Sequence, residues 1–279
     1  MIRAMLYTKK AAATTSKELM EKNPGAREFK KFSADIADKI VDAIDTILAD
    51  FENFYENHFP LVVWQTGSGT QTNMNTNEVI AGVANEKATG IKGGKSPIHP
   101  NDHCNLGQSS NDTFPTAMHI ATVLATYEKL IPTMVRFSNE LAKKEEQFQE
   151  IVKIGRTHTQ DATPVTLGQE FSSYKVQIKH ALFNVAYCTG SIEELAQGGT
   201  AVGTGINSHK DFAKLFASHA TKITDLENLH KSVCDLDVVS CSNLNQVKVS
   251  SSKAFKKGLA FSGKFVGDKN FLHFQTMMT

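Results

Sequence analysis

The sequence predicts a mainly α-helical protein whose long helices pack side by side in a bundle. Long stretches carry apolar residues at steps of three and four, and polar segments rich in small residues separate these stretches. No convincing series of strands is present in the pattern. Of the 279 residues, 41% are hydrophobic and 21% are charged, which is sufficient for a sizeable core and one or two domains.

The first third of the chain predicts three helical segments. The N-terminal stretch has no acidic residue before Glu18 and mildly resembles a transit peptide, but a first helix is the plainer interpretation. A helix is predicted from Phe29 to Phe51, and a shorter one from Glu78 to Ala88. The apolar face of the Phe29 to Phe51 helix would consist of Phe32, Ile36, Ile40, Ile44, Ile47 and Phe51.

Two longer helical stretches follow. One runs from Phe114 to Ile151, with a kink or break expected at Pro132, and the other from Thr166 to Gln197, with a weak point at Gly190. The periodicity weakens later in the chain. These observations predict an N-terminal helical region (1–98), a central part of a helical bundle (99–207) and an atypical tail (208–279). The tail could be poorly ordered, a divergent domain or the product of an altered reading frame.

Charge and cysteine content exclude several classes of function. The formal net charge is +1, which indicates neither nucleic acid nor an anionic membrane as a partner, and Lys253, Lys256 and Lys257 form only a small basic cluster. The four cysteines form no CxxC pair, so neither a zinc site nor a disulfide framework is predicted. No apolar run approaches the roughly 18 residues that a membrane helix needs.

Polar loops interrupt the predicted helices three times. They are Gly67 to Asn77, His99 to Thr116 and Gly155 to Pro164, and a helical stretch follows each. Helix N-termini expose unpaired N–H groups, and nearby Ser, Thr and Asn side chains add donors, so a carboxylate or phosphate is the natural ligand. The alternative is that these residues merely cap helices.

His158 in the third loop has three interpretations. It lacks partners at the spacing of a metal site, and it could be an ordinary loop histidine. An acid/base role suits it best, because an unperturbed pKa of about 6.5 allows proton exchange near neutral pH. There is no GxxxxGK[ST] motif, and the glycines of "GGTAVGTG" follow a helix rather than a strand, so no nucleotide site is indicated.

Several long motifs carry a family resemblance. "SGTQTNMNTNEVIA", "HPNDHCN", "QSSNDTFPTAMHIA", "GRTHTQDATP", "TLGQEFSSY" and "GGTAVGTGIN" together resemble class II fumarase, a member of the fumarase/aspartase superfamily, from about Ala4 to Asn207. Within the superfamily, "GRTH" and "SSND" are similar to fumarases, whereas aspartases resemble GRTQ and carry Thr at the second position of SSND.

The resemblance implies an all-α fold of the fumarase/aspartase type and a homotetramer whose active sites each draw on three subunits. It implies reversible hydration of fumarate to (S)-malate in the tricarboxylic acid cycle, without metal or cofactor, in the mitochondrial matrix or the cytoplasm. His158 would be catalytic, and a second dicarboxylate site would lack the family's arginine, which is Ser96 here. The implied substrate-binding residues are Ser68, Gly69, Thr70, Ser109, Ser110, Asn111 and Thr157, and the second site would comprise His99, Pro100, Asn101 and Asp102.

One family motif is missing from the sequence. The loop that resembles GSSIMPGKVNP carries the base for the carbon acid, and "VSSSKAFKKG" (Val249 to Gly258) lacks its Met-Pro-Gly core. The chain is therefore expected to be an incomplete bundle, truncated at both ends, with little or no hydratase activity. The alternatives are a non-catalytic dicarboxylate-binding protein and an ammonia or amidine lyase of the aspartase or argininosuccinate lyase type.

Overall fold

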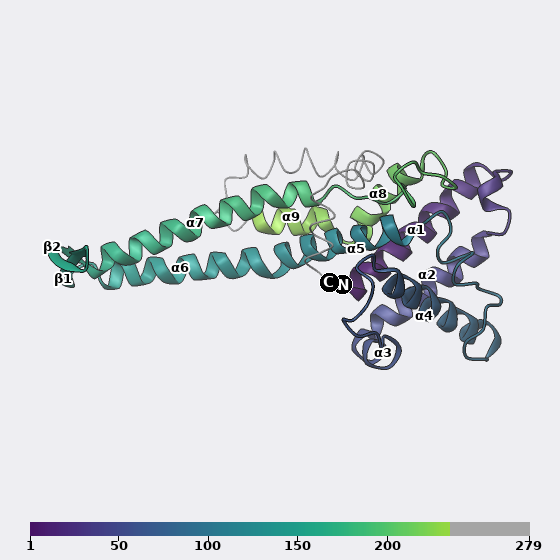
Figure 1. Cartoon of the computed structure of the whole chain (residues 1–279), viewed down its shortest axis with the longest axis horizontal. Helices are drawn as coiled ribbons and strands as arrows, with labels where there is room; N and C mark the ends of the chain where they lie inside the picture. The colour runs from purple at the N-terminus through teal and green to yellow at the C-terminus, as the bar shows by residue number, and fades with distance from the viewer. Residues whose placement is uncertain (235–279) are drawn as a thin grey trace. The chain divides into compact units, whose positions relative to one another are not determined.

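A computed structural model of the protein describes residues 1–234 (Figure 1). Within these residues helices predominate, and the strands form one hairpin, so the prediction of a mainly α-helical fold is confirmed. The described residues form two compact units. The first comprises Met1–Thr122 and Ile192–Leu226, and the second comprises Val123–Ser191 and 227–234. The domain boundaries predicted at 98 and 207 stay a prediction.

The first unit is a cluster of helices around α1, which packs against α2, α4 and α8. Its helices are α1 (Ile2–Lys22), α2 (Ala34–Ala49), α3 (Phe51–His58), α4 (Thr70–Thr89) and α8 (Phe212–Ile223), with a 3-10 turn at Arg27–Phe29. Fully buried apolar side chains such as Leu6, Ile44, Ile80 and Phe216 form the core between them. Burial of such side chains stabilises each helix far more than its intrinsic propensity does.

The predicted helix from Phe29 to Phe51 is present in shortened form as α2. Ser33 caps it, because its Oγ accepts a hydrogen bond from the N–H of Ile36 at 3.2 Å. Ile40, Ile44 and Ile47 are buried as their spacing predicts. Phe29 and Phe32 are also buried, but they precede the cap and lie outside α2.

The first predicted loop, Gly67 to Asn77, is mostly helical, so its interpretation as a loop was wrong. Helix α4 begins at Thr70 rather than near Glu78. Its polar residues Asn73, Thr76 and Asn77 occupy the buried face in line with Ile80. They favour loops when exposed, but here the Nδ2 groups of Asn73 and Asn77 donate tertiary hydrogen bonds, and Thr76 bonds back to the carbonyl of Thr72.

The second unit contains the long helices. Its elements are a π turn (Thr126–Leu130), α6 (Ile131–Gln147), β1 (Val152–Thr157), β2 (Gln160–Thr166), α7 (Leu167–Ile192) and α9 (Leu226–Cys234). The boundary between the units falls within α5 (Ser110–Ala125), which belongs to the first unit up to Thr122, and the first residue of α9 also belongs to the first unit. Helices α6 and α7 run side by side (Figure 1). Where a kink or break was predicted at Pro132, the chain stays helical but forms the π turn, which ends two residues before the proline, since proline cannot donate to the carbonyl of residue 128 and its ring crowds that group.

The third predicted loop is an antiparallel β-hairpin at one end of α6 and α7 (Figure 1). Val152 pairs with Thr166 and Thr157 with Gln160, with an irregularity between Ile154 and Arg156. No strand was predicted here, because most of the hairpin is exposed on both faces and therefore requires no alternation of apolar and polar residues.

The first part of the predicted tail is helical, since α8 and α9 lie within it. Residues 235–279 lie outside the described part, and with them the basic cluster and the Val249 to Gly258 segment discussed above. Within residues 1–234, none of the helices combines the length and apolar character that crossing a membrane requires.

Candidate functional site

The N-terminal ends of α4 and α5 meet in the first unit. Asn73 in the first turns of α4 donates from Nδ2 to Oγ of Ser110, the first residue of α5, at 3.0 Å. Gly69 lies directly before α4, and a Cβ there would be 2.1 Å from Cγ of Phe114 on α5. The structure therefore brings the Ser68–Thr70 segment and the Ser109–Asn111 segment together.

Gly69 satisfies two requirements at this junction. Its φ of +68° lies in the left-handed region, which residues other than glycine adopt only at a cost in conformational energy. The ring of Phe114 fills the space that a Cβ would occupy. Beside it, Oγ of Ser68 lies 3.2 Å from Oγ1 of both Thr66 and Thr70. The first segment thus presents a group of hydroxyls at the start of a helix.

Asp112 fixes the second segment from inside the protein. Its carboxylate is fully buried and accepts hydrogen bonds from the N–H of Ser109 at 2.9 Å, of Gly198 at 3.0 Å and of Thr200 at 2.8 Å. The bond to Ser109 resembles half of a capping box. Asn111 adds a second link, because its Nδ2 donates to the carbonyl of Ala201 at 2.9 Å.

The glycine-rich segment Gln197 to Asn207 therefore serves as a support for the start of α5. Gly198 has a φ of +98°, and a Cβ there would lie 2.8 Å from Cβ of Ala213 on α8. Thr200 also adopts a positive φ, of 57°. Gly198 thus allows this segment to pack closely against α8.

A buried lysine lies behind the second segment. Lys9 of α1 is 1% exposed, and its Nζ donates to Oδ1 of Asn105 and to Oε1 of Gln108, both at 2.9 Å. Oδ1 of Asn105 also accepts from Nδ2 of Asn73 at 3.2 Å and of Asn77 at 3.3 Å. Asn105 is thus the point at which α1, α4 and the second loop are joined.

Burial shifts the pKa values of the ionisable groups in this cluster. It lowers the pKa of Lys9 to about 7, against the opposing effect of the charges on Cys104 and Asp112. It raises the pKa of Cys104 to about 12. It also raises the pKa of Asp112, although the three backbone N–H groups and the charge of Lys9 favour the carboxylate form. Each shift disfavours the charged form of the buried group.

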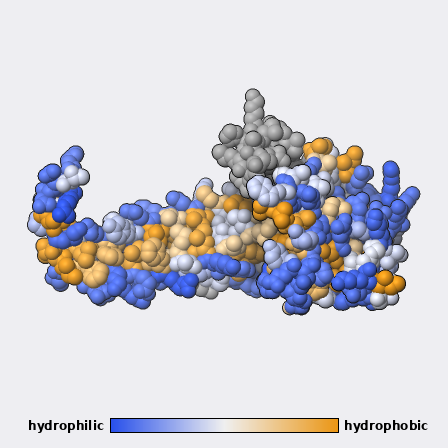
Figure 2. Space-filling model, turned by 60° about the horizontal axis from the view of Figure 1, so that its bottom comes forward, coloured by the Kyte–Doolittle hydropathy of each residue, from blue (hydrophilic) through white to orange (hydrophobic). Residues whose placement is uncertain are grey.

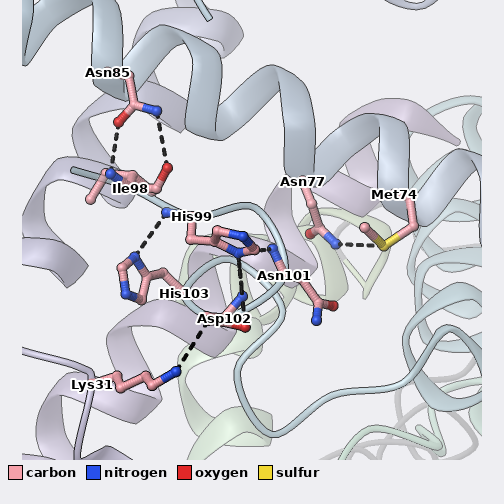
Figure 3. A network of polar contacts seen from close by, with 9 residues as sticks. All are labelled: Lys31, Met74, Asn77, Asn85, Ile98, His99, Asn101, Asp102 and His103. Atoms are coloured by element: carbon pink, nitrogen blue, oxygen red, sulfur yellow. Dashed lines mark hydrogen bonds and ion pairs between the residues drawn. The ribbon is translucent and has the colours of Figure 1, made fainter. Parts of the chain in front are cut away.

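The His99 to His103 segment forms a tight turn whose polar groups bond to one another (Figure 3). Nδ1 of His99 accepts hydrogen bonds from the N–H of Asn101 at 3.2 Å and of Asp102 at 3.1 Å. The N–H of His99 donates to Nδ1 of His103 at 2.9 Å. Next to the turn, the side chain of Asn85 bonds to both the N–H and the carbonyl of Ile98.

Lys31 brings a cation to this turn from another part of the chain. Nζ of Lys31 lies 3.7 Å from Oδ2 of Asp102 (Figure 3), and the Lys31 side chain is exposed whereas Asp102 is half-buried. Desolvation is the largest cause that lowers the pKa of His103, and the charge of Asp102 opposes it. The N–H groups of Asn101 and Asp102 already bond to His99, so an anion at this turn would have to bind mainly to side chains.

His158 lies at the turn of the hairpin in the second unit. Thr157 and Gln160 form the last pair of the ladder, so His158 and Thr159 are the two loop residues. Their φ values are 50° and 62°, as a type I′ turn requires. Asn and Gly are the usual residues of such turns, and a β-branched threonine is strained there. His158 and Thr157 are both exposed.

The predicted site residues thus fall into two groups. The Ser68 to Thr70 and Ser109 to Asn111 segments lie together in the first unit, as does the His99 to Asp102 turn, whereas Thr157 and His158 belong to the second unit. Among residues 1–234, no group of three or more His, Cys, Asp and Glu side chains is placed to hold a metal ion.

Sequence reasoning missed the buried supports of the site. Lys9 was the detectable one, because it occupies a core-facing position of α1 between Met5 and Ala12, at the steps of four and three that mark a buried stripe. A lysine at such a position needs polar partners elsewhere in the fold. Asn73 and Asn105 carried no comparable signal, because isolated asparagines are common in loops.

Comparisons with known proteins agree with the motifs. A protein-family model described as Lyase matches residues 1–250. The chain is 55% identical over 224 residues to the class II fumarate hydratase of Rickettsia conorii, and 53% identical over 225 residues to that of Rickettsia bellii; each match covers 80% of this chain and 46% of the relative. The chain therefore spans about half the length of the curated relatives that it matches.

A solved structure supports the same assignment. The crystal structure of class II fumarase from Schistosoma mansoni matches with a TM-score of 0.72 and 40% identity, over 83% of this chain and 45% of that one. The sequence match and the structural match both extend over most of the present chain. From the match of the family model over residues 1–250, the chain belongs to the lyase family, and its similarity within that family is to the class II fumarate hydratases.

Proposed function

We propose that this chain carries the dicarboxylate-binding part of a fumarate hydratase, which interconverts fumarate and (S)-malate in the tricarboxylic acid cycle. The observation that carries the proposal is the junction of α4 and α5, where the Asn73–Ser110 hydrogen bond brings two helix N-termini together. Similarity to proteins named class II fumarate hydratase supports the choice of substrate. Ser68, Gly69, Thr70, Ser109, Ser110 and Asn111 are the proposed ligands of the substrate.

The chemistry of the two helix N-termini suits this substrate. Fumarate and malate each carry two carboxylates, and hydroxyls and N–H groups at a helix start bind negative charge. When C3 of malate loses its proton, charge spreads into the adjacent carboxylate. Donors that are already in place stabilise the transition state, in which this charge develops, more than they stabilise the ground state, and this lowers the barrier. The links from Asp112 to Ser109 and from Asn73 to Ser110 keep these donors in place.

His158 is proposed to handle the proton of the water or hydroxyl at C2, with Thr157 in contact with the substrate. An imidazole can both accept and donate a proton near neutral pH. Its exposed position on a hairpin turn suits a group that works at another surface. In the proposed homotetramer, each active site draws on three subunits. The proposed reaction uses neither a metal nor an organic cofactor, and the compartment, mitochondrial matrix or cytoplasm, stays a prediction.

The base that removes the C3 proton is not assigned. The 279 residues contain no GSSxMPGKxN motif, and Val249 to Gly258 lies outside the described residues. In a homotetramer of this chain every copy lacks the motif. We therefore propose that the chain by itself binds fumarate or malate and converts them slowly or not at all. This observation also favours the second candidate function, a dicarboxylate-binding protein without turnover.

The His99 to Asp102 turn is proposed as a second, non-catalytic dicarboxylate site with His99, Pro100, Asn101 and Asp102 as its residues. Lys31 supports this proposal, because it brings a cation to a turn in which Ser96 stands at the position of the family's arginine. Its separation from Asp102, 3.7 Å, leaves the ammonium group free to bind an added carboxylate as well.

Two measurements on the purified chain test the proposed function. Titration calorimetry with fumarate and with (S)-malate should detect binding, and Ser110→Ala should weaken it about tenfold by removing a hydroxyl donor to a charged ligand. The absorbance of the fumarate double bond should rise slowly or not at all when malate is supplied. Failure to bind either acid would contradict both candidate functions, and rapid fumarate formation would refute the predicted loss of activity.

A control assay separates the remaining alternative. Release of ammonia from aspartate, or of fumarate from argininosuccinate, would identify an ammonia or amidine lyase. We expect neither product, because His158 and the "SSND" segment resemble the fumarase forms of these motifs.

A further inference from the structure

The hydrogen bonds of the buried Lys9 indicate a role beyond the packing of α1. Its side chain is 1% exposed, and long cationic side chains are rarely buried to that extent unless they are paired. Its hydrogen-bond acceptors are two neutral amide oxygens in the second loop, on Asn105 and Gln108. Desolvation of an amine costs stability, so these bonds are expected to secure something besides the packing of α1.

A short chain of hydrogen bonds connects Lys9 to a proposed substrate ligand. Nζ of Lys9 donates to Oδ1 of Asn105, which also accepts from Nδ2 of Asn73. The same Nδ2 of Asn73 donates to Oγ of Ser110 at 3.0 Å. Movement of Asn105 would therefore disturb the position of Asn73, and with it the hydroxyl of Ser110.

Gln108 provides the second connection. Its Oε1 accepts from Lys9 at 2.9 Å, and its Nε2 donates to the carbonyl of Cys104 at 3.2 Å. Ser109 follows it directly in sequence. Most side chains from Asn105 to Ser110 are only half-buried. Polar contacts rather than apolar packing therefore determine the position of this stretch.

We infer that Lys9 is a positioning residue for the dicarboxylate site: its amine holds Asn105 and Gln108 together and thereby fixes Ser109, Ser110 and Asn111 at the start of α5. The effect on binding rests on the proposed function. The effect on the loop itself can be measured without a ligand, so the two are separable by experiment.

The first test is hydrogen exchange of the full chain, analysed by mass spectrometry. Lys9→Met removes the amine and keeps an unbranched side chain of similar length. We expect amides between residues 104 and 113 to exchange about tenfold faster or more, as expected for loss of the two hydrogen bonds that the amine donates. Exchange in α2 and α8 should change far less. Lys9→Arg, which keeps the donors, should restore part of the protection.

Lys10 provides a matched control on the same helix. It is the next residue, carries the same charge and pairs with Asp45 of α2 instead of the loop. Lys10→Met should leave exchange between residues 104 and 113 at the wild-type rate. Equal acceleration by the two variants, or uniform acceleration of all helices in Lys9→Met, would reduce Lys9 to a packing role and overturn the inference.

The second test is calorimetric titration with fumarate. Lys9→Met should weaken binding about tenfold, while Lys10→Met should not change it. Unaltered binding by a folded Lys9→Met chain would overturn the inference. If the wild-type chain binds neither fumarate nor malate, the proposed function fails, and the exchange rates alone decide whether Lys9 positions the loop.

A second pair of variants covers the case in which Lys9→Met does not fold. Gln108→Leu removes an acceptor of the Lys9 amine, whereas Gln108→Glu keeps an oxygen there; both remove the Nε2 donor. Protection between residues 104 and 113 should be lower in Gln108→Leu than in Gln108→Glu. Equal protection in both would show that the contact with Lys9 contributes nothing to the loop, against the inference.

Discussion

At the scale of single residues, the buried Lys9 predicts how stability depends on pH. Its pKa is lowered from 10.5 to about 7 in the folded chain, so between these values the unfolded chain binds more protons. The free energy of unfolding should therefore rise from pH 7 to pH 9, by at most about 1.4 kcal/mol per pH unit from this group. Above pH 9 the rise should end, because the thiol of Cys104 then loses its proton in the unfolded chain but keeps it in the folded chain up to about pH 12. This difference has the opposite sign to that of Lys9 and offsets it.

Urea denaturation of the wild-type chain and of Lys9→Met at pH 7, 8 and 9 checks this prediction. Lys9→Met should lose most of the increase, and Lys10→Met should retain it. The difference between variants isolates Lys9 from every other group that titrates in the same range. A slope that survives in Lys9→Met would show that another group is responsible.

Gly69 gives a second prediction at this scale. Gly69→Ala places a Cβ 2.1 Å from the ring of Phe114 and a side chain at a φ of +68°. Strain and overpacking together should lower the free energy of unfolding by about 2–4 kcal/mol. Because Ser68 and Thr70 flank this position, binding of fumarate should weaken as well.

Gly90 at the other end of α4 is the matched control. Its φ is +74°, but no atom lies within 4 Å of a Cβ built there. Gly90→Ala should therefore cost only about 1 kcal/mol from backbone strain. Denaturation curves of the two variants should differ clearly, and equal losses would show that contact with Phe114 is not what restricts Gly69.

At the scale of elements, the hairpin around His158 predicts a gain in local order. Thr159 is a β-branched residue at a φ of 62°, which costs about 1–2 kcal/mol relative to glycine. Thr159→Gly should therefore slow hydrogen exchange of the amides from Val152 to Thr166. Thr163→Gly on β2, away from the turn, should instead speed their exchange. Faster exchange in Thr159→Gly would contradict a type I′ turn at this position.

The accuracy of the sequence-based predictions differed among elements for physical reasons. Helix α2 was predicted because its buried face is apolar and regularly spaced. The start of α4 was missed because Asn73 and Asn77 occupy its buried face and find their partner, Asn105, 28 or more positions away in sequence. The hairpin was missed because its exposed strands require no apolar face. Local patterns report burial against apolar groups, and these elements depend on polar contacts.

At the scale of the whole molecule, the sequence motifs supplied more of the candidate site than periodicity did. Ser68, Ser109 and Ser110 were selected from motifs, and the structure places them in one unit around Asn73. His158 belongs to the other unit, so its proposed role rests on its motif alone. If each active site draws on three subunits, as proposed, then neither the sequence nor the fold of one chain defines the complete site.

The second unit leads to a prediction about assembly. Several aromatic side chains on α6 and α7 are 42–65% exposed, namely Phe137, Tyr174, Phe183 and Tyr187. Figure 2 shows apolar surface along these helices. Phe183 and Tyr187 lie one turn apart with their rings stacked at 6.3 Å, so they form a continuous apolar surface. Extended exposed apolar surface of this kind indicates self-association, in agreement with the proposed homotetramer.

The double variant Phe183→Glu, Tyr187→Glu should therefore shift the chain from tetramer to smaller species in sedimentation velocity experiments. Four added charges per pair of facing helices would be costly to bury in an interface between copies. Ile91→Glu is the control, because Ile91 is 71% exposed in the loop after α4 and belongs to the other unit. This control should sediment as the wild type does. A wild-type chain that is already monomeric at micromolar concentration would contradict the proposed assembly, whereas a tetramer unaffected by the double variant would place its interface elsewhere on the chain.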